Sequence, residues 1–427
     1  MRRILQFILK ILARATIKKY RPRVVGITGS VGKTSTKEAV AAVLGTKYQV
    51  RQTNKNFNNE IGLPLTIIGA PDSGYRNPAA WLGIFARAVK NLLVREVSYP
   101  EVLVLEMGVD HLGDMDYLLS IVRPDVAVIT AASAVHLEFL GTVDQVAQEK
   151  GKLAKAVPKT GLVVLNYQDM RLRKLADKLP ARVVWFGFDH SADIWADGVA
   201  ISRDNSGAVQ GLSFKLHFGG SSTPLLLPKI LGQHQINIAL AAAAVGVNMG
   251  VNSVAVSEVL KNIVFPPGRM KLLSGIKKTW VIDDSYNSSP LAASEAVRSL
   301  AAWPDTKGGR RWALLGDMLE LGLDSEGLHR QLGAEVVDLS IDYLVTVGER
   351  SRDIGRGAGA AGFNPDHYNH FAKAEEAGEY LRNKISEHDI ILVKGSQGVR
   401  LEKAVKMLMA EPARAGELLV RQGKPWL

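Results

Sequence analysis

Four residues near the start of the chain have the types and spacing of a phosphate-binding loop. Gly29 and Gly32 lie three residues apart in GITGSVGKTST, and Lys33 and Thr34 follow directly. Glycines let backbone N–H groups approach phosphate oxygens at the start of a helix, where the helix dipole favours anions. The lysine would contact the β- and γ-phosphates of a nucleotide, and the threonine hydroxyl would bind Mg²⁺. We therefore predict a nucleotide site, although the common loop G-x-x-x-x-G-K-[ST] would have a glycine in place of Ile27.

Two further polar residues follow apolar runs that are typical of buried strands. Glu106 ends VLVLE, where a carboxylate is well placed to bind Mg²⁺, and His136 follows DVAVIT after a short loop. Each residue alone has a structural explanation, because a carboxylate can cap a turn and a lone histidine is usually part of the core. The carboxyl ends of parallel strands share one edge of a sheet, so their common position with Lys33 favours a metal site.

The segments around these residues alternate between strand and helix patterns. A helix is predicted at KTSTKEAVAAVL, and buried parallel strands are predicted at RVVGIT, EVLVLEMG, DVAVIT, GLVVLN and RVVWFGF. Residues 190–230 include the alternating run GLSFKLHF, which predicts antiparallel strands added to the same sheet, and INIALAAAAVGVNMG predicts a buried helix. The sequence thus favours a central P-loop ATPase domain with a mostly parallel sheet.

A second α/β series follows a linker. Pro266, Pro267 and Gly268 break the pattern, and strands are then predicted at TWVIDDS, RRWALLGDM, DYLVTVG and DIILVKGS. We expect an α/β protein with three parts: a basic amphipathic N-terminal helix (1–22), the central ATP-binding domain (23–265) and a C-terminal Rossmann-like domain (266–427).

The positive charge of the chain is concentrated in its first segment. Residues 1–23 contain eight bases and no acid, so the other 404 residues carry a net charge of only +3, eight less than the +11 of the whole chain. This distribution argues against a nucleic-acid partner. The first helix is too short and too polar to span a bilayer, so it either lies on an anionic membrane surface or packs on protein. Another basic amphipathic helix is predicted near residues 80–95.

Composition excludes several classes of chemistry. The chain has no cysteine, which rules out disulfides, zinc–thiolate sites and thiol nucleophiles and agrees with a reducing cytoplasm. A hydrophobic content of 47% and a charged content of 22% are ordinary for a globular protein. A secretory signal peptide is disfavoured because a loop for cytosolic nucleotide follows at once. We expect a cytoplasmic monomer, for which contact of residues 1–20 with a membrane surface is one of the two alternatives for the first helix.

A series of motifs resembles the Mur ligase family from about residue 23 to residue 408. In order, they are GITGSVGKTSTKE, NKNFNNEIGLP, VLEMGVDHLGDM, HLEFLGTVDQVAQEKGKL, PPGRMKL, IDDSYNSSP, LLGDMLELG and LVKGSQGVR. The short-spaced loop G-x-x-G-K-T is the family's own form of the P-loop. The family usually begins with a separate domain that binds the uridine diphosphate of its substrate, whereas only residues 1–22 precede the first strand predicted here.

The resemblance implies an ATP-dependent, ADP-forming amide ligase of peptidoglycan precursor synthesis. ATP would phosphorylate a peptide carboxylate, and an amine would displace phosphate from the acyl phosphate. Within the family, the motifs are most similar to those of members that add D-Ala-D-Ala to a UDP-N-acetylmuramoyl (UDP-MurNAc) tripeptide, which implies these substrates. Another Mur-type or polyglutamate-type ligase is the alternative, and a P-loop switch ATPase is an alternative of a different class.

The resemblance also implies roles for individual residues. The catalytic residues would be Lys33, Glu106, His136 and Lys150. Two Mg²⁺ ions would be held by Thr34, Glu106, His136 and a carbamylated Lys150, whose amine must be neutral to react. ATP would be bound by Gly29, Ser30, Val31, Gly32, Lys33, Thr34, Ser35, Gln235, Arg269, Asp284 and Asn287. The peptide and amine substrates would be bound by Asn58, Asn59, Tyr286, Asp317, Lys394, Ser396 and Arg400.

Three places depart from the family pattern. The adenine segment, usually G-x-H-N-x-x-N-x-L-A-A, has Gln235 and Ile238 in place of the two asparagines. Ala131 stands where an asparagine often precedes the histidine motif. Lys152 occupies the acidic position two residues after the lysine that is carbamylated in the family.

Overall fold

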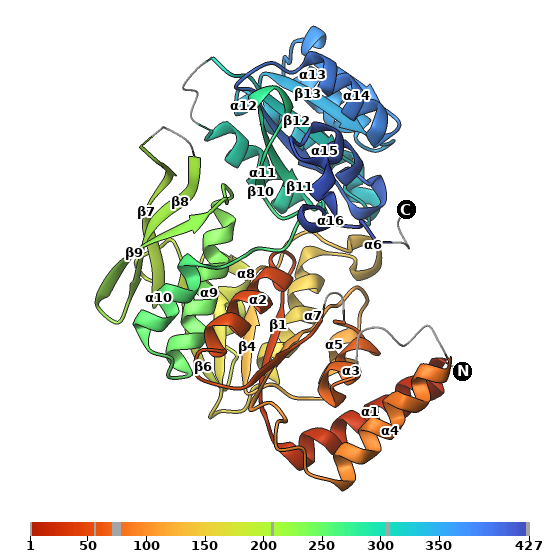
Figure 1. Ribbon diagram of the computed structural model, residues 1–427, viewed down its shortest axis with the longest axis vertical. Coiled ribbons are helices and arrows are strands. Elements are labelled where there is room, and N and C mark those ends of the chain that lie inside the picture. The colour runs from red at the N-terminus through yellow and green to blue at the C-terminus, as the bar shows by residue number, and fades with distance from the viewer. Residues whose placement is uncertain (1, 55–56, 71–77, 206–208, 304–307, 424–427) are drawn as a thin grey trace.

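Two separate sheets organise the chain, one above the other in Figure 1. The computed structural model describes residues 2–54, 57–70, 78–205, 209–303 and 308–423. Both sheets are mostly parallel and carry helices on both faces, which confirms the α/β class predicted from the sequence. The boundaries predicted at residues 22/23 and 265/266 remain predictions.

The first sheet has nine strands in the order β2-β3-β1-β4-β5-β6-β7-β8-β9. Its first six strands are parallel, and β7, β8 and β9 continue it as an antiparallel meander, as the alternating pattern predicted. The strands are β1 (Arg23–Thr28), β2 (Val50–Gln52), β3 (Val102–Glu106), β4 (Val126–Ile129), β5 (Leu162–Asn166), β6 (Arg182–Gly187), β7 (Ile194–Arg203), β8 (Val209–Phe218) and β9 (Ser221–Pro228).

Alternate side chains of each central strand enter different cores. Val25 and Ile27 of β1 pack with α2 and the buried helix α9, whereas Val24 on the opposite face packs with α5 and α7. The helices of this half are α2 (Lys33–Leu44), α3 (Gly62–Ile68), α5 (Asp114–Leu119), α6 (Leu137–Leu140), α7 (Val143–Lys155), α8 (Met170–Ala176), α9 (His234–Asn248) and α10 (Ser253–Lys261). Burial on both faces explains the continuous apolar runs of the sequence.

The second sheet has six strands in the order β10-β11-β15-β12-β13-β14. All neighbours are parallel except β10 and β11. The strands are β10 (Lys271–Ser274), β11 (Trp280–Asp284), β12 (Arg311–Gly316), β13 (Tyr343–Val347), β14 (Tyr368–Phe371) and β15 (Ile390–Lys394). The four longest apolar runs predicted β11, β12, β13 and β15. The short edge strands β10 and β14 carry a weaker pattern and were not predicted.

Helices cover both faces of this sheet, as they do those of the first. The α-helices are α11 (Pro290–Ala301), α12 (Ser325–Asp338), α13 (Arg352–Ala360), α14 (Ala374–Lys384), α15 (Glu402–Leu408) and α16 (Ala415–Leu418). The short 3₁₀ helices are η1 (Ile276–Lys278), η2 (Gly322–Asp324), η3 (Pro365–His367), η4 (Gln397–Val399) and η5 (Pro412–Arg414).

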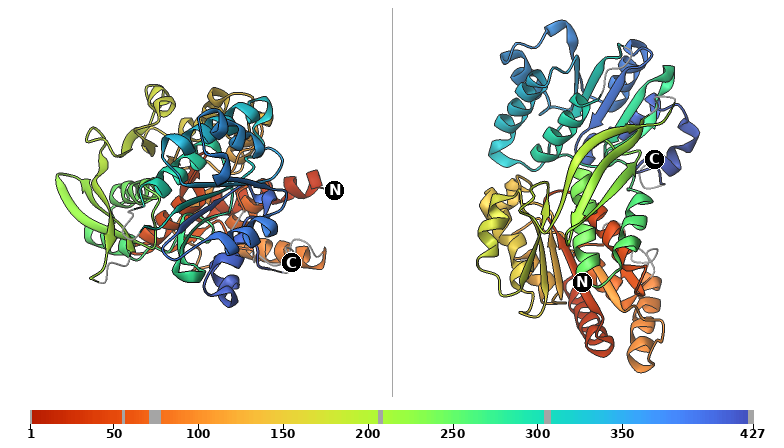
Figure 2. Two further views of the ribbon diagram at one scale, coloured as in Figure 1. Left: turned by 90° about the horizontal axis from the view of Figure 1, so that it is seen from above. Right: turned by 90° about the vertical axis from the view of Figure 1, so that its left-hand side faces the viewer.

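Two amphipathic helices extend side by side from the lower end of the molecule (Figures 1 and 2). They are α1 (Arg2–Tyr20) and α4 (Pro78–Leu93), and α1 packs against both α3 and α4. Both helices were predicted from sequence. Among the described residues, no helix combines the length and the apolar character that a bilayer crossing requires.

Candidate active site

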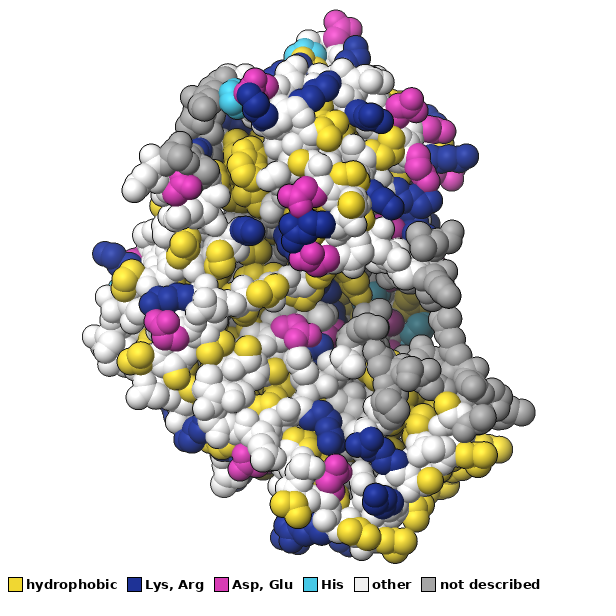
Figure 3. All heavy atoms as spheres, in the orientation of Figure 1, with side chains coloured by type: hydrophobic (Ala, Val, Ile, Leu, Met, Phe, Trp, Pro, Cys, Tyr) yellow, Lys and Arg dark blue, Asp and Glu magenta, His cyan; other side chains and the backbone are white. Residues whose placement is uncertain are grey.

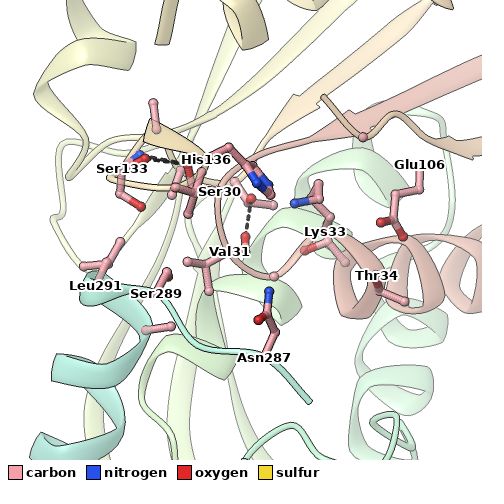
Figure 4. Close-up of a pocket in the computed structure, with 18 of the residues that line it drawn as sticks. Ser30, Val31, Lys33, Thr34, Glu106, Ser133, His136, Asn287, Ser289 and Leu291 are labelled. Atoms are coloured by element: carbon pink, nitrogen blue, oxygen red, sulfur yellow. Dashed lines mark hydrogen bonds between the residues drawn. The ribbon is translucent and has the colours of Figure 1, made fainter. Parts of the chain in front are cut away.

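A cleft of about 2000 Å³ lies between the carboxyl-end loops of the two sheets. Most of the residues predicted to act chemically line it, although they come from segments far apart in the sequence (Figure 4). These are Ser30, Val31, Gly32, Lys33, Thr34, Ser35, Asn58, Asn59, Glu106, His136, Gln235, Arg269, Asp284, Tyr286, Asn287, Lys394, Ser396 and Arg400. Gly29, Lys150 and Asp317 are not among the residues that line it.

The phosphate-binding loop connects β1 to α2 and depends on its two glycines. Gly29 has φ 148°, and a Cβ at this position would lie 1.9 Å from Oγ1 of Thr130. Gly32 has φ 80° and forms the N-cap of α2. Thr130 Oγ1 donates to the carbonyl of Val31 at 2.5 Å, which connects the loop to the residue that directly follows the neighbouring strand β4. The short spacing therefore builds a complete loop at a helix N-terminus.

The Lys33 ammonium lies inside this loop. Its Nζ donates to the carbonyl oxygen of Gly29 at 2.8 Å. Burial lowers the pKa of Lys33, while the carboxylates of Glu106 and Asp110 raise it. A partly desolvated cation next to backbone N–H groups is suited to bind phosphate oxygens.

The next residue, Thr34, connects the two halves of the molecule. Its hydroxyl oxygen accepts a hydrogen bond from Nη2 of Arg269 at 3.2 Å. The Arg269 guanidinium also lies 4.2 Å from the centroid of the Tyr286 ring. These contacts bring an arginine from the predicted linker next to the phosphate-binding loop.

One carboxylate oxygen of Glu106 accepts a hydrogen bond, and the other has no hydrogen-bond partner. It ends β3 and is only 2% exposed. Asn58 Nδ2 donates to Oε1 at 3.0 Å, whereas Oε2 is buried without a hydrogen-bond partner. Figure 4 shows Glu106 beside Lys33 and Thr34. A buried carboxylate oxygen with no protein partner is expected to bind a cation.

Lys150 is a buried amine without a partner. It lies on α7, is fully buried, and its Nζ makes no hydrogen bond. Desolvation, followed by the charge of Lys33, lowers the pKa of Lys150 to about 7, against the opposing effects of Asp110 and Glu149. The amine is therefore substantially neutral near pH 7, which is the state that carbamylation requires.

Lys152, which stands where the family has an acidic residue, forms ion pairs with two nearby carboxylates. Its Nζ contacts Asp116 and Glu149, each at 2.6 Å. Glu149 is buried and also accepts from the backbone N–H groups of Gly113 and Met115. At this departure from the family pattern, Lys152 thus belongs to a local ion-pair network that does not include the Lys150 amine.

His136 bridges the two halves. Its Nδ1 lies 2.6 Å from Oε2 of Glu320, and its Nε2 lies 3.2 Å from Oδ1 of Asp110. The hydrogen bond with His136 lowers the pKa of Glu320. Because both ring nitrogens contact carboxylates, the metal role of His136 remains a prediction that requires one of these contacts to open. Sequence reasoning did not select Asp110 or Glu320, although both occur in motifs that signalled the family.

The segment expected to bind adenine carries the side-chain amides of Gln235 and Asn237, whereas the family pattern has two asparagines. Gln235 is 3% exposed, its Nε2 lies 3.4 Å from the carbonyl of Arg269, and its Oε1 has no partner. Asn237, which the sequence analysis did not select, lines the cleft and has a buried, unpartnered Oδ1. Burial lowers the pKa of the adjacent His234 to about 4, so its ring is neutral. These groups can hydrogen-bond a nucleobase.

Two residues predicted to bind different ligands are paired with each other. Lys394 Nζ donates to Oδ2 of Asp284 at 2.6 Å and to the carbonyl of Asn287 at 3.0 Å. Lys394 is 2% exposed, and Oδ1 of Asp284 accepts from the backbone of Met270 at 3.2 Å. Adjacent parallel strands β11 and β15 align the two residues. The pair therefore also has a structural role at the cleft wall.

Four other predicted substrate residues have structural partners, among them Arg400, whose Nε donates to Oε1 of Glu402 at 2.6 Å. Asn59 Oδ1 accepts from the backbone N–H of Gly62 at 3.0 Å, which fixes the start of α3. Asp317 accepts from the backbone of Ser351 at 2.8 Å and lines a second cavity of about 630 Å³, and Arg400 lines both cavities. Ser396 Oγ accepts from the backbone N–H of Leu319 at 3.0 Å. Their substrate roles remain predictions.

The donor set at the loop suits Mg²⁺ better than a transition metal. Among the described residues, no group of three or more histidine and acidic side chains is arranged to hold a metal ion. The Thr34 hydroxyl and the unpartnered Oε2 of Glu106 instead provide oxygen ligands, and Mg²⁺ commonly takes few protein ligands together with substrate phosphates.

Comparison with known proteins identifies the class to which this fold and site belong. Residues 27–79 and 86–246 match the Mur ligase middle domain, and residues 268–397 match the Mur ligase glutamate ligase domain. The chain therefore belongs to the Mur ligase family of ATP-dependent amide ligases. This membership decides against a P-loop switch ATPase.

Two relatives with about 30% identity to this chain carry the same enzyme name. The chain is 30% identical to the UDP-N-acetylmuramoyl-tripeptide–D-alanyl-D-alanine ligase of Bacillus subtilis (strain 168), covering 94% of this chain and 79% of the relative. The enzyme of the same name from Escherichia coli (strain K12) is 31% identical, with 90% and 76% covered. The crystal structure of MurF ligase from Thermotoga maritima in complex with ADP is 25% identical, with a TM-score of 0.77 over 94% of this chain and 83% of that chain.

Proposed function

We propose that this protein joins D-Ala-D-Ala to a UDP-MurNAc tripeptide, with conversion of ATP to ADP and phosphate. The observation that carries the proposal is the 30% identity over 94% of the chain to a ligase of that name. The cleft between the two sheets supports it, since its volume of about 2000 Å³ accommodates a nucleotide together with an extended peptide. The proposed setting is the bacterial cytoplasm, where peptidoglycan precursors are assembled.

The first step would activate the peptide carboxylate. The loop from Gly29 to Gly32 would hold the phosphates of ATP, and Lys33 would offset the charge that moves to the β–γ bridging oxygen. A carboxylate oxygen of the tripeptide attacks the γ-phosphorus, the bond to the bridging oxygen breaks, and ADP leaves. Arg269, 3.2 Å from the Thr34 hydroxyl, would approach the same phosphates from the other half of the cleft.

Magnesium fits the residues present. Thr34 Oγ1 and the unpartnered Oε2 of Glu106 would hold it, and when bound it supplies positive charge that screens the phosphates during transfer. The buried amine of Lys150 would add CO₂ and release one proton, giving a carbamate in place of an ammonium. A carbamate would reverse the charge at this position and supply further oxygen ligands. His136 would serve a second ion.

The second step would form the amide bond. The neutral amine of D-Ala-D-Ala would attack the acyl carbon to form a tetrahedral intermediate. The amine nitrogen would lose one proton to phosphate or solvent, and phosphate would leave with the electrons of the broken C–O bond. The dipeptide would be bound by residues of the C-terminal half: Ser396 and Arg400 at the cleft, and Asp317 in the second cavity, which Arg400 also lines. Asn58 and Asn59, on the opposite wall, would orient the tripeptide. Gln235 and Asp284 would hold adenine and ribose.

Product analysis tests the proposal. The enzyme is incubated with MgATP, a UDP-MurNAc tripeptide and D-Ala-D-Ala, and the products are weighed by mass spectrometry. The expected result is one UDP-MurNAc pentapeptide for each ADP, with no product when the dipeptide is omitted. Single amino acids, including L-Ala and D- and L-Glu, are tested in parallel. Ligation of glutamate alone would contradict the proposed substrate and favour a polyglutamate-type ligase.

A further inference from the structure

The outer face of the α1–α4 pair has no role in the cleft or in the cores. The inner side of α1 packs on the protein through Leu9 and Ala13, both fully buried. Ile84 and Ala88 of α4 join the same interior. The inner faces of both helices are thus buried in the core. The outer faces have no packing partner among the described residues.

Large hydrophobic side chains are concentrated on these outer faces. Nine of the 17 exposed large hydrophobic residues that the structure describes belong to α1 or to the segment from Leu82 to Val97. Phe7 is 63% exposed and Leu93 is 80% exposed. The full set is Ile4, Phe7, Ile8, Ile11, Leu82, Val89, Leu93, Val94 and Val97. A concentration of this kind marks an interaction surface.

Basic side chains outnumber acidic ones around this apolar surface, where Glu96 is half-buried between Arg95 and Val97 and Glu60 binds Arg2. Neither α1 nor α4 contains an aspartate or glutamate. Exposed bases on and beside the two helices are Arg3, Arg14, Lys18, Arg21, Arg87, Lys90 and Arg95. Figure 3 shows hydrophobic and basic side chains next to each other at the lower right, over α1 and α4. The charge of the surface is complementary to anionic lipid rather than to the rest of this chain, which is itself slightly basic.

Apolar and basic residues occupy one face of α1. At 100° per residue, Ile4, Phe7, Ile11, Arg14 and Lys18 fall within an arc of about 80° on the side opposite to the buried face. This arrangement lets the apolar side chains enter the acyl boundary while the bases contact headgroups. The helices also extend from the body of the molecule, so a flat surface can reach them (Figure 2).

We propose that the outer face of α1 and α4 docks on the surface of an anionic lipid bilayer. The helices lie in the plane of the interface and do not cross it. The first turn of α1 also belongs to the cleft, because Arg2 and Gln6 line it and both bond Oε1 of Glu60, at 2.6 and 3.0 Å. Docking would therefore hold the mouth of the cleft close to the membrane surface.

Vesicle sedimentation of the full-length chain tests the proposal. Vesicles of equal parts phosphatidylglycerol and phosphatidylcholine are compared with vesicles of phosphatidylcholine alone. We expect binding to the anionic vesicles that weakens as salt is raised. The double change Arg14→Gln with Lys18→Gln should lower the partition coefficient roughly 30-fold, since each base near an anionic surface contributes a factor of about five. The change Phe7→Ser should lower it about tenfold or more.

Matched changes elsewhere provide the controls. Lys155→Gln removes an exposed base on α7, and Val254→Ser removes an exposed hydrophobic residue on α10; neither should alter sedimentation. Surface changes are preferred to removal of α1, because loss of Leu9 and Ala13 would open the core. Thermal unfolding curves matching wild type establish that the variants are folded.

Three outcomes would overturn the proposal. They are absence of vesicle binding, equal binding to both kinds of vesicle, and a dimer in solution that Phe7→Ser dissociates. The last result would assign the surface to a second copy of the chain. None of these outcomes bears on the ligase assay, because sedimentation is measured without substrates.

Discussion

Replacing Lys150 with methionine tests whether the protein holds this amine in its neutral form. Methionine is similar in length and can occupy the same buried site without charge. The lysine is fully buried and its Nζ has no hydrogen-bond partner. The wild-type protein therefore pays a desolvation penalty whenever this group is protonated, and the variant does not.

The size of the expected stability change follows from the pKa of Lys150. An ordinary lysine has a pKa of 10.5, and burial lowers that of Lys150 to about 7. Above pH 10.5 the amine is neutral in both the folded and the unfolded chain. As the pH falls from about 10.5 to about 7, only the unfolded chain takes up the proton, which lowers the free energy of unfolding by up to about 5 kcal/mol at about 1.4 kcal/mol per pH unit. Below about pH 7 both forms bind the proton and the loss is constant.

The assay is urea unfolding between neutral and alkaline pH, in CO₂-free buffer containing a chelator. We expect Lys150→Met to be more stable than wild type near pH 7 by a few kcal/mol. This difference in the free energy of unfolding should shrink as the pH approaches the pKa of an ordinary lysine. Lys155→Met, on the exposed side of the same helix, should follow wild type throughout. A stability difference between Lys150→Met and wild type that is the same at every pH would refute the reasoning. Despite its stability, Lys150→Met should lose ligase activity about 100-fold or more, because the proposed carbamate cannot form.

Three further predictions concern the cleft. Lys33→Met should lower the ligation rate about 1000-fold or more, as measured by ADP release, because Lys33 offsets the charge that develops during phosphoryl transfer. Glu106→Gln should raise the Mg²⁺ concentration needed for half-maximal activity about 100-fold, and an unchanged magnesium titration would contradict a role for its free Oε2. Asp284→Asn should destabilise the fold by about 3–5 kcal/mol because it leaves the buried Lys394 ammonium unpaired. Adding Lys394→Met to that variant should recover part of the loss, and additive effects of the two changes would show that the pair is uncoupled.

The central sheet and the phosphate-binding loop could be predicted because their signals are local. Apolar runs mark strands that are buried on both faces, and the glycine spacing specifies the turn before α2. The end of β3 placed Glu106 correctly at the cleft. Predicting these features required no knowledge of how distant segments meet.

Contacts between segments far apart in the sequence could not be predicted from local patterns. The bridge from His136 to Glu320 joins residues 184 positions apart, and the pair of Asp284 with Lys394 joins residues 110 positions apart. Their formation depends on the relative position of two sheets and on strand order within the second sheet. Periodicity likewise predicted the helix α1, but it did not predict which face of α1 packs against the rest of the protein. Only the structure shows that Leu9 is buried and Phe7 is exposed.

Oxygen transfer from the peptide carboxylate to phosphate tests the central claim most directly. The acceptor peptide is prepared with a heavy oxygen isotope in its reacting carboxylate, and the phosphate released during ligation is analysed by mass spectrometry. Activation through an acyl phosphate in the cleft predicts that each phosphate carries one labelled oxygen, because the carboxylate oxygen leaves with phosphorus when the amine attacks. Unlabelled phosphate, accompanied by amide product, would show that ATP is hydrolysed by water and would contradict the proposed chemistry.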